Sequence, residues 1–388
     1  MRGAADGLPV TWTGAEELAE IVAAEQPDLV VVGNEAPLVD GIVDLLTARG
    51  IRAFGPTKAA ARIESSKIFA KELMEKYHIP TAKFASFTHP GRAKTYLVRK
   101  PAPFVIKADG LAQGKGVIIA KDNAEAQAAI DVMLRDHQFG SAGNRIVIEE
   151  FMEGREVSLL AFVDGETVVP LIPAQDYKRL GDHNEGPNTG GMGSIAPVSM
   201  SDEDYQAAVE TILKPTARAL VEEGCPFRGV LYAGLMLTAD GPKVVEFNCR
   251  FGDPETQVLL PLLENDLAEV LEAVVDGRLA DVELKWRDGA AVCVVLAAFG
   301  YPRKVYKGDR ITGIDKVEAY TDVHLCHAAT RYIEGAYYTD GGRVLDVVAV
   351  RETMATAQQA AYEALEKIEF DGMQYRSDIA ADELERLQ

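Results

Sequence analysis

Apolar runs and a helical pattern alternate over the first sixty residues. Asp28–Gly33 is a short apolar run ending in glycine, which predicts a buried parallel strand. Apolar residues at helical spacing across Leu38–Leu46 predict a helix that Gly50 ends, and Ile51–Pro56 predicts the next strand. This order predicts a doubly wound section. We expect it to be incomplete, because the residues before it have the pattern of a loop where such a sheet would start with its own strand and Gly-rich turn.

Helical and period-two patterns then alternate through the middle of the chain. The predicted helices are Ser65–Tyr77 (capped by Ser65 or Ser66), Glu125–Leu134 and the amphipathic Asp202–Gly224. The predicted strands are Lys83–Phe87, Pro103–Lys107, Val117–Ala120, Arg145–Glu150, Glu156–Val163, Val168–Ile172, Val230–Leu237 and Lys243–Asn248. Gln175–Pro197 is polar, and so long a loop is usually functional. Short strands from about Ala290 and a helix at Thr353–Ile368 close the chain.

Length and charge narrow the class of protein. The 388 residues suffice for two or three domains. The net charge of −20 argues against nucleic acid or an anionic membrane surface as the main partner. No apolar run reaches the length of about 18 residues that spans a membrane, and the first residues do not form a signal peptide. Four scattered cysteines predict small, mostly buried free thiols in a reducing compartment: Cys225, Cys249, Cys293 and Cys326.

The first candidate for chemistry is the segment FVIKADGLAQGKGVIIA (Phe104–Ala120). A strand brings Lys107 to its end, and a Gly-rich hairpin containing Gly114, Lys115 and Gly116 follows. Glycines let backbone N–H groups approach phosphates closely, and a lysine adds a point charge. The spacing is not that of a P-loop. The alternative is an ordinary β-hairpin with a surface lysine.

The second candidate is IVIEEFMEGREVSLLAFVDG (Ile146–Gly165). Glu149 and Glu150 end an apolar strand beside Phe151, and Glu156 follows a glycine turn. A carboxylate can accept from an adenine amino group, a backbone amide can contact the ring, and another carboxylate can hold ribose hydroxyls. The alternative is a set of solvated acids at the mouth of a hairpin.

The third candidate is VVEFNCRFGDPETQ (Val244–Gln257). Glu246 and Asn248 lie two apart on a predicted strand, so they point to one face. Their hard oxygen atoms suit Mg²⁺ held between protein and nucleotide phosphates. Arg250 continues the alternation and could stabilise charge on a transferring phosphoryl group.

The fourth candidate is the polar segment Pro173–Pro197. Asp176, Lys178 and Arg179 supply charges of both signs, and the glycines of Asn188–Gly193 supply exposed backbone. This composition suits a small zwitterion together with a phosphate group. The alternative is a solvated surface loop.

These segments occur in the order found in the ATP-grasp superfamily. QDYKR, GPNTGGMG, GVLYAGLML and EFNCRFGDPETQ together resemble the phosphoribosylamine–glycine ligase family, and the likeness extends through GNEAPLVDG, FGPTKAAARIESSK, IKADGLAQGKG, HAAT and TDGGRVL. The resemblance implies an ATP-grasp fold of the α/β and α+β class with a doubly wound N-terminal section. It implies an incomplete N-terminal substrate domain over residues 1–62, an ATP-grasp domain over 63–286 with a lid lobe at about 82–148, and an α+β domain over 287–388.

The resemblance also implies a reaction. ATP would phosphorylate glycine to glycyl phosphate, the amine of 5-phosphoribosylamine would attack, and glycinamide ribonucleotide, ADP and phosphate would leave, as in de novo purine biosynthesis. Catalysis would consist of positioning and charge neutralisation. The cofactors would be ATP with Mg²⁺ or Mn²⁺, the partners small molecules only, and the protein a cytoplasmic monomer.

Residue roles follow from the same resemblance. Lys67, Lys107, Gly114, Lys115 and Gly116 would hold the phosphates, with Gly110–Gly116 as a closing lid. Glu149, Glu150 and the backbone near Phe151 would hold adenine, and Glu156 the ribose. Glu246 and Asn248 would bind the metal. The catalytic set would be Arg250, Lys107, Asp176 and Lys178. The substrate side would comprise Glu35, Asp176, Lys178, Asn188, Thr189, Gly190, Gly191, Arg250 and Arg343.

The chain departs from the family pattern at its start, where a strand and a Gly-rich loop are usual. Two alternatives therefore stay open beside the ligase. One is a truncated form that binds ATP without turnover. The other is a different ATP-grasp ligase that joins another carboxylate and amine.

Overall fold

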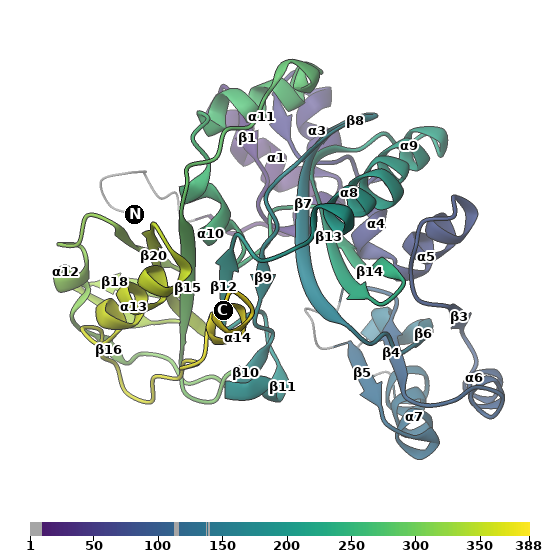
Figure 1. Cartoon of the computed structure of the whole chain (residues 1–388). Helices are drawn as coiled ribbons and strands as arrows, with labels where there is room; N and C mark the ends of the chain where they lie inside the picture. The colour runs from purple at the N-terminus through teal and green to yellow at the C-terminus, as the bar shows by residue number, and fades with distance from the viewer. Residues whose placement is uncertain (1–9, 112–115, 137, 139) are drawn as a thin grey trace.

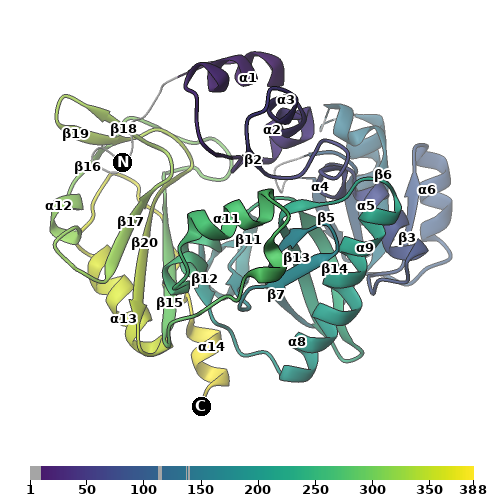
Figure 2. The ribbon, with the colours of Figure 1, turned by 90° about the horizontal axis from the view of Figure 1, so that it is seen from above.

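The described residues of the N-terminal section form three helices beside two very short parallel strands (Figures 1 and 2). The computed structural model describes residues 10–111, 116–136, 138 and 140–388. The N-terminal elements are α1 (Ala15–Ala24), β1 (Val30–Val31), α2 (Glu35–Asp40), α3 (Ile42–Ala48) and β2 (Ala53–Phe54). Val30 pairs with Ala53 and Val31 with Phe54 in parallel, as predicted.

Two expectations for this section were wrong. The opening is not all loop, because it contains α1, which packs on α3. The single predicted helix is two helices, because Gly41 adopts φ = 94°, ending α2 and starting α3 in a new direction. Only glycine adopts this left-handed conformation without steric cost.

A four-stranded antiparallel sheet forms the outer lobe, at the lower right of Figure 1. Its order is β3-β6-β4-β5, with β3 (Phe84–Phe87), β4 (Phe104–Ala108), β5 (Val117–Ala120) and β6 (Ile146–Glu150). The helices α6 (Pro90–Leu97), missed from the sequence, and α7 (Asn123–Ile130) cover one face. Phe104 and Ile106 are buried under these helices, whereas Val105 and Lys107 line a cavity on the opposite face. The two-residue period of the strand produces this division.

A second four-stranded antiparallel sheet lies at the centre, in the order β14-β13-β7-β8. Its strands are β7 (Arg155–Asp164), β8 (Thr167–Pro170), β13 (Arg228–Thr238) and β14 (Gly241–Asn248). Its helices are α4 (Arg62–Ser65), α5 (Lys67–Lys76), α8 (Asp202–Ala208), α9 (Lys214–Glu222) and, against the other face, α11 (Leu267–Val275). Ser66 caps α5, as predicted. Because β7 and β13 are covered on both faces, their sequences are apolar almost throughout.

A five-stranded sheet organises the C-terminal section, in the order β17-β20-β15-β12-β9. The strands are β9 (Gln175–Asp176), β12 (Gly193–Ala196), β15 (Ala290–Ala297), β17 (Val323–His327) and β20 (Arg343–Arg351), with α13 (Met354–Leu365) packed on them. The other strands and α-helices are β10 (Arg179–Gly181), β11 (Glu185–Asn188), β16 (Arg310–Ile311), β18 (Thr330–Ile333), β19 (Ala336–Thr339), α10 (Thr256–Leu259), α12 (Ile314–Val317) and α14 (Ala381–Arg386).

The segment Gln175–Pro197 is therefore not only a loop. It contributes two strands to the five-stranded sheet and folds β10 and β11 into a small hairpin. Every residue of β12 is buried, and a Cβ at Gly193 would lie 2.6 Å from the carbonyl oxygen of Cys293 on β15. Small residues permit this close pairing, but they lack the apolar alternation by which strands are recognised.

Candidate active site

A cavity of about 530 Å³ lies where the outer lobe, the central sheet, the N-terminal section and the C-terminal section meet. It collects residues that are far apart in the sequence. Those singled out beforehand that line it are Glu35, Lys67, Lys107, Gly116, Glu149, Glu150, Phe151, Glu156, Asp176, Lys178, Asn188, Thr189, Gly190, Glu246, Asn248, Arg250 and Arg343. Gly191 does not line the cavity, and Gly114 and Lys115 lie outside the described residues.

Apolar side chains from the outer lobe, α5 and the central sheet form one part of the cavity lining. They include Met74, Val105, Val117, Ile119, Met152, Met236 and Phe247, none of them singled out from the sequence. Phe151 stands beside them, 39% exposed. We call this part of the lining the apolar slot. An apolar surface with few polar groups is typical of a small-molecule binding site and suits a flat ring. Two of these contacts could have been inferred from the sequence. Val105 lies two residues before Lys107 on one strand, and Val117 lies two residues before Ile119 on the next, so the two side chains of each pair point to the same face.

Two lysines and a glutamate form a buried charged cluster next to the slot. The carboxylate of Glu149, on β6, lies 3.0 Å from the ammonium of Lys71, on α5, and 3.0 Å from that of Lys107, on β4. Lys107 also donates to the carbonyl of Val245 at 2.8 Å, and Lys71 to the hydroxyl of Thr81 at 2.8 Å. Burial lowers the pKa of Lys71 to about 8, against the attraction of Glu149. Two partners thus hold Glu149 before any ligand binds.

Lys71 was missed from the sequence, although a signal existed. It lies four residues after Lys67 on α5, so both side chains leave the same face of the helix. Both line the cavity.

A second charged cluster surrounds Arg250 at the opposite end. Its guanidinium lies 3.2 Å from Glu35, at the start of α2, and 3.5 Å from Glu64, on α4. Glu64 also accepts from the backbone N–H of Cys249 at 2.7 Å. Burial raises the pKa of Glu64, and Arg250 opposes that rise. Arg250 therefore joins the N-terminal section to the central sheet.

Glu246 and Asn248 stand on β14 between these clusters, and both line the cavity. Glu246 pairs in register with Gly234 of β13, which has no side chain to compete for the space. Burial opposes ionisation of Glu246, but nearby cations outweigh it and lower its pKa; they are Lys178, Lys107, Lys67 and Arg250. An ionised carboxylate beside an amide oxygen is a donor set that hard divalent cations prefer.

A third group of charges lies on the side of the C-terminal sheet. Lys178 contacts the carboxylate of Glu156 at 2.7 Å. Although burial opposes its charge, the carboxylates of Glu156, Glu246 and Asp176 raise the pKa of Lys178. Oδ1 of Asp176 is buried and has no hydrogen-bond partner within the described residues. Burial, reinforced by the charge of Glu255, raises the pKa of Asp176.

Glu255 was also missed from the sequence. It is buried, lines the cavity, and accepts from the hydroxyls of Tyr232 and of Ser158, the latter at 3.0 Å. The Ser158 and Tyr232 hydroxyls are 2.8 Å apart. The acids Asp176 and Glu255 thus face the same part of the cavity, and only Glu255 has hydroxyl partners.

Arg343 fixes the glycine-containing loop after β11. It donates to the carbonyl of Gly190 at 2.7 Å and pairs with Asp253 at 2.7 Å. A Cβ at Gly191 would lie 2.4 Å from Cδ of Pro254, and its φ of 111° disfavours other residues. Gly191 is therefore needed for close packing beneath the cavity.

Neither a metal site built from several protein side chains nor a membrane-spanning helix is found in the described residues. No group of three or more His, Cys, Asp or Glu side chains in the described parts of the chain is placed to hold a metal ion. No described helix is long and apolar enough to cross a membrane. All four cysteines are free thiols, as predicted.

Known proteins of one family match nearly the whole chain. The models of the phosphoribosylglycinamide synthetase N domain, ATP-grasp (A) domain and C domain match residues 3–64, 65–256 and 291–382. The phosphoribosylamine–glycine ligase of Caldanaerobacter subterraneus is 48% identical over 94% of this chain and 87% of its own length. The trifunctional purine biosynthetic protein adenosine-3 of Gallus gallus is 49% identical over 93% of this chain but 36% of its own length.

Solved structures give the same result. The phosphoribosylamine–glycine ligase of Thermotoga maritima superposes with a TM-score of 0.83 at 36% identity, covering 93% of this chain and 88% of that one. The biotin carboxylase domain of the Hydrogenobacter thermophilus 2-oxoglutarate carboxylase, with a TM-score of 0.74 at 16% identity, shares the fold. The predicted ATP-grasp fold is confirmed.

Proposed function

Because the chain belongs to the phosphoribosylamine–glycine ligase family of ATP-grasp, C–N bond-forming enzymes, we propose that the cavity joins glycine to 5-phosphoribosylamine with cleavage of ATP to ADP and phosphate. The product is glycinamide ribonucleotide, and the pathway is purine biosynthesis. The observation that carries this proposal is the convergence of three charged clusters and one apolar slot on a single cavity. This arrangement favours the ligase over a protein that only binds ATP.

The apolar slot suits the adenine ring, with Phe151 and Met152 beside it. Within the described residues, Oε1 of Glu149 makes no well-aligned hydrogen bond, although it lies 3.0 Å from the ammonium of Lys107. A lone pair on this oxygen would therefore be free to accept from the adenine amino group. Lys67 and Lys107 would neutralise the phosphates. Glu156 is the candidate for the ribose hydroxyls.

Ligases of this family use ATP with a divalent metal ion, and the donor set here fits Mg²⁺ or Mn²⁺. Mg²⁺ is usually held by one or two carboxylates together with substrate phosphates. Glu246 and Asn248 provide two oxygen donors beside the lysines that would face the phosphates. When bound, the ion would neutralise phosphate charge.

The substrates would occupy the side lined by Asp176, Lys178 and Arg250. The unpartnered buried oxygen of Asp176 can accept from an ammonium group such as that of glycine. Glu35, the Asn188–Gly190 loop and Arg343 form the rest of this side and would contact 5-phosphoribosylamine.

The reaction then needs no protein nucleophile. A glycine carboxylate oxygen would attack the terminal phosphorus and release ADP, and the glycyl phosphate formed would be attacked at its carbonyl carbon by the amine, with loss of phosphate. Arg250 and Lys178 would stabilise the negative charge that develops on the phosphoryl and acyl oxygens. Holding the reactants in line would add to this stabilisation by lowering the entropic cost of reaction.

We further propose a cytoplasmic monomer that acts on small molecules only. The net charge of −20 and the four free thiols support this. The division into domains near residues 62 and 286 remains a prediction.

The function is tested by analysing the products that the purified protein forms. ADP and glycinamide ribonucleotide should form only when ATP, Mg²⁺, glycine and freshly made phosphoribosylamine are all present. ADP release that depends on a different acid or amine would reassign the substrate. ATP binding without product under any combination would contradict the proposal.

A further inference from the structure

The two lysines proposed to face the phosphates come from different parts of the fold, so something must fix their separation. Lys67 is the first residue of α5, which packs on the central sheet, and Lys107 lies near the end of β4 in the outer lobe. Asp109, two residues after Lys107, is 5% exposed and touches α5. It lies within the segment IKADGLAQGKG, but the sequence analysis assigned it no role.

The carboxylate of Asp109 caps α5 from outside the helix. Its Oδ1 accepts from the backbone N–H of Ile68 at 2.7 Å and from the hydroxyl of Ser66 at 3.1 Å. Its backbone carbonyl accepts from the N–H of Lys67 at 3.3 Å. A carboxylate at a helix N-terminus satisfies free N–H groups and interacts favourably with the helix dipole. The end of β4 is thus attached to the turn of α5 that carries Lys67.

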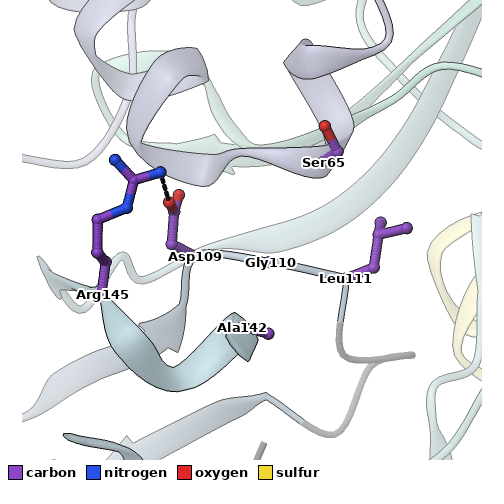
Figure 3. Close-up of a pocket in the computed structure, with 6 residues that line it drawn as sticks. All are labelled: Ser65, Asp109, Gly110, Leu111, Ala142 and Arg145. Atoms are coloured by element: carbon purple, nitrogen blue, oxygen red, sulfur yellow. Dashed lines mark ion pairs between the residues drawn. The ribbon is translucent and has the colours of Figure 1, made fainter. Parts of the chain in front are cut away.

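The turn that begins with Asp109 is held from its other side as well. Arg145 Nη2 lies 2.5 Å from Asp109 Oδ2, an ion pair drawn in Figure 3, and the N–H of Asp109 donates to the Arg145 carbonyl at 3.0 Å. A Cβ at Gly110 would lie 2.7 Å from Cβ of Ala142, so this turn packs directly on the segment before β6. The carbonyl of Gly110 then accepts from Lys67 Nζ at 3.5 Å.

We propose that Asp109 is a positioning residue for the nucleotide, which sets the separation of Lys67 and Lys107 by clamping the end of β4 onto the N-terminus of α5. This inference rests on the proposed function only in identifying the ligand as ATP. Asp109 does not line the main cavity. It lines the polar pocket of about 300 Å³ drawn in Figure 3, so it would act through the lysines.

A matched pair of variants separates positioning from helix capping. Asp122 caps α7 in the same lobe by accepting from Ala124 at 2.8 Å and Glu125 at 2.9 Å, and it lines neither pocket. The readouts are the melting temperature, the dissociation constant for a non-hydrolysable ATP analogue with Mg²⁺, and KM and kcat for ATP.

We expect Asp109→Ala to raise both the dissociation constant and KM roughly tenfold, because one charge-assisted hydrogen bond to the N-terminus of α5 is lost. Asp109→Asn keeps an oxygen acceptor and should have a smaller effect. Asp122→Ala should lower the melting temperature similarly and leave nucleotide affinity unchanged. Equal affinities in Asp109→Ala and Asp122→Ala would overturn the proposal.

Two further measurements keep the test decisive. If Asp109→Ala does not fold, Asp109→Asn and Arg145→Gln replace it, and unchanged analogue affinity in both would reject the role. Hydrogen exchange at the Ile68 amide should be faster in Asp109→Asn than in the wild type. Analogue binding is independent of turnover, so a wild-type chain that binds the analogue but forms no product contradicts the ligase function and leaves this test intact.

Discussion

The two charged ends of the cavity hold their charges in different ways. At the outer-lobe end, the side chains of Lys71, Lys107 and Glu149 are 3–4% exposed, and the one carboxylate pairs with both ammonium groups. At the opposite end, Arg250 is 20% exposed and Glu35 27% exposed. Buried charges are costly unless fully paired, whereas partly hydrated charges can exchange partners. The first end therefore holds its groups in fixed positions and keeps one positive charge for the phosphates, whereas the second end can rearrange its ion pairs when a substrate binds.

Glu246 tests whether the ends act as one site, because cations from both ends lower its pKa. We expect Glu246→Ala to reduce kcat at least roughly 10³-fold, equivalent to about 4 kcal/mol, since a metal ligand is lost. Circular dichroism and the melting temperature should show a folded protein. Near-normal turnover in a folded Glu246→Ala variant would remove Glu246 from the metal site.

Breaking the buried cluster should act mainly on stability. Glu149→Ala leaves Lys71 and Lys107 without their carboxylate in a dry site, so we expect a loss of about 3 kcal/mol in the free energy of unfolding. Glu150→Ala, one residue along on the exposed side of the strand, is the control and should cost less than about 1 kcal/mol. Urea unfolding measures both. Equal losses of unfolding free energy in Glu149→Ala and Glu150→Ala would mean that the buried cluster does not stabilise the fold.

Altering the open end should act mainly on catalysis. Arg250→Lys keeps the charge but loses the planar fork that reaches Glu35 and Glu64, so we expect roughly 30-fold lower kcat/KM, about 2 kcal/mol, with little change in melting temperature. Arg52→Lys is the control, because Arg52 pairs with Glu272 and Asp276 away from the cavity. A lower melting temperature in Arg250→Lys with unchanged kcat/KM would mean that Arg250 serves stability and not catalysis, which contradicts the prediction.

The stability of the buried end should also depend on pH. The pKa of Lys71 is about 8 in the folded protein and 10.5 for an ordinary lysine, so between these values the unfolded chain holds more protons. Stability contributed by this group should therefore rise with pH, from a low value below pH 8, by about 2 kcal/mol between pH 7 and 10. The difference between wild type and Lys71→Met, from urea unfolding at pH 7 to 10, isolates this term. A flat or falling difference would contradict the shift.

Much of the site could be predicted from the sequence, where a strand period brings functional groups to one face. Lys107 and the pair Glu246 and Asn248 are examples: each is tied to its strand, and each lines the cavity. The apolar runs of β7 and β13 likewise predicted buried strands, because both faces of the central sheet are covered. Local periodicity determines these features, so one chain segment is enough to recognise them.

The tertiary structure decided what depends on partners far along the chain. The strand β12 lacks an apolar alternation and exists because β15 accepts its small residues closely. Glu149 contacts two lysines, and Asp109 caps a helix whose N-cap residue, Ser66, lies 43 residues earlier in the sequence. Side-chain roles such as these depend on which segments meet in space, and no local pattern encodes that.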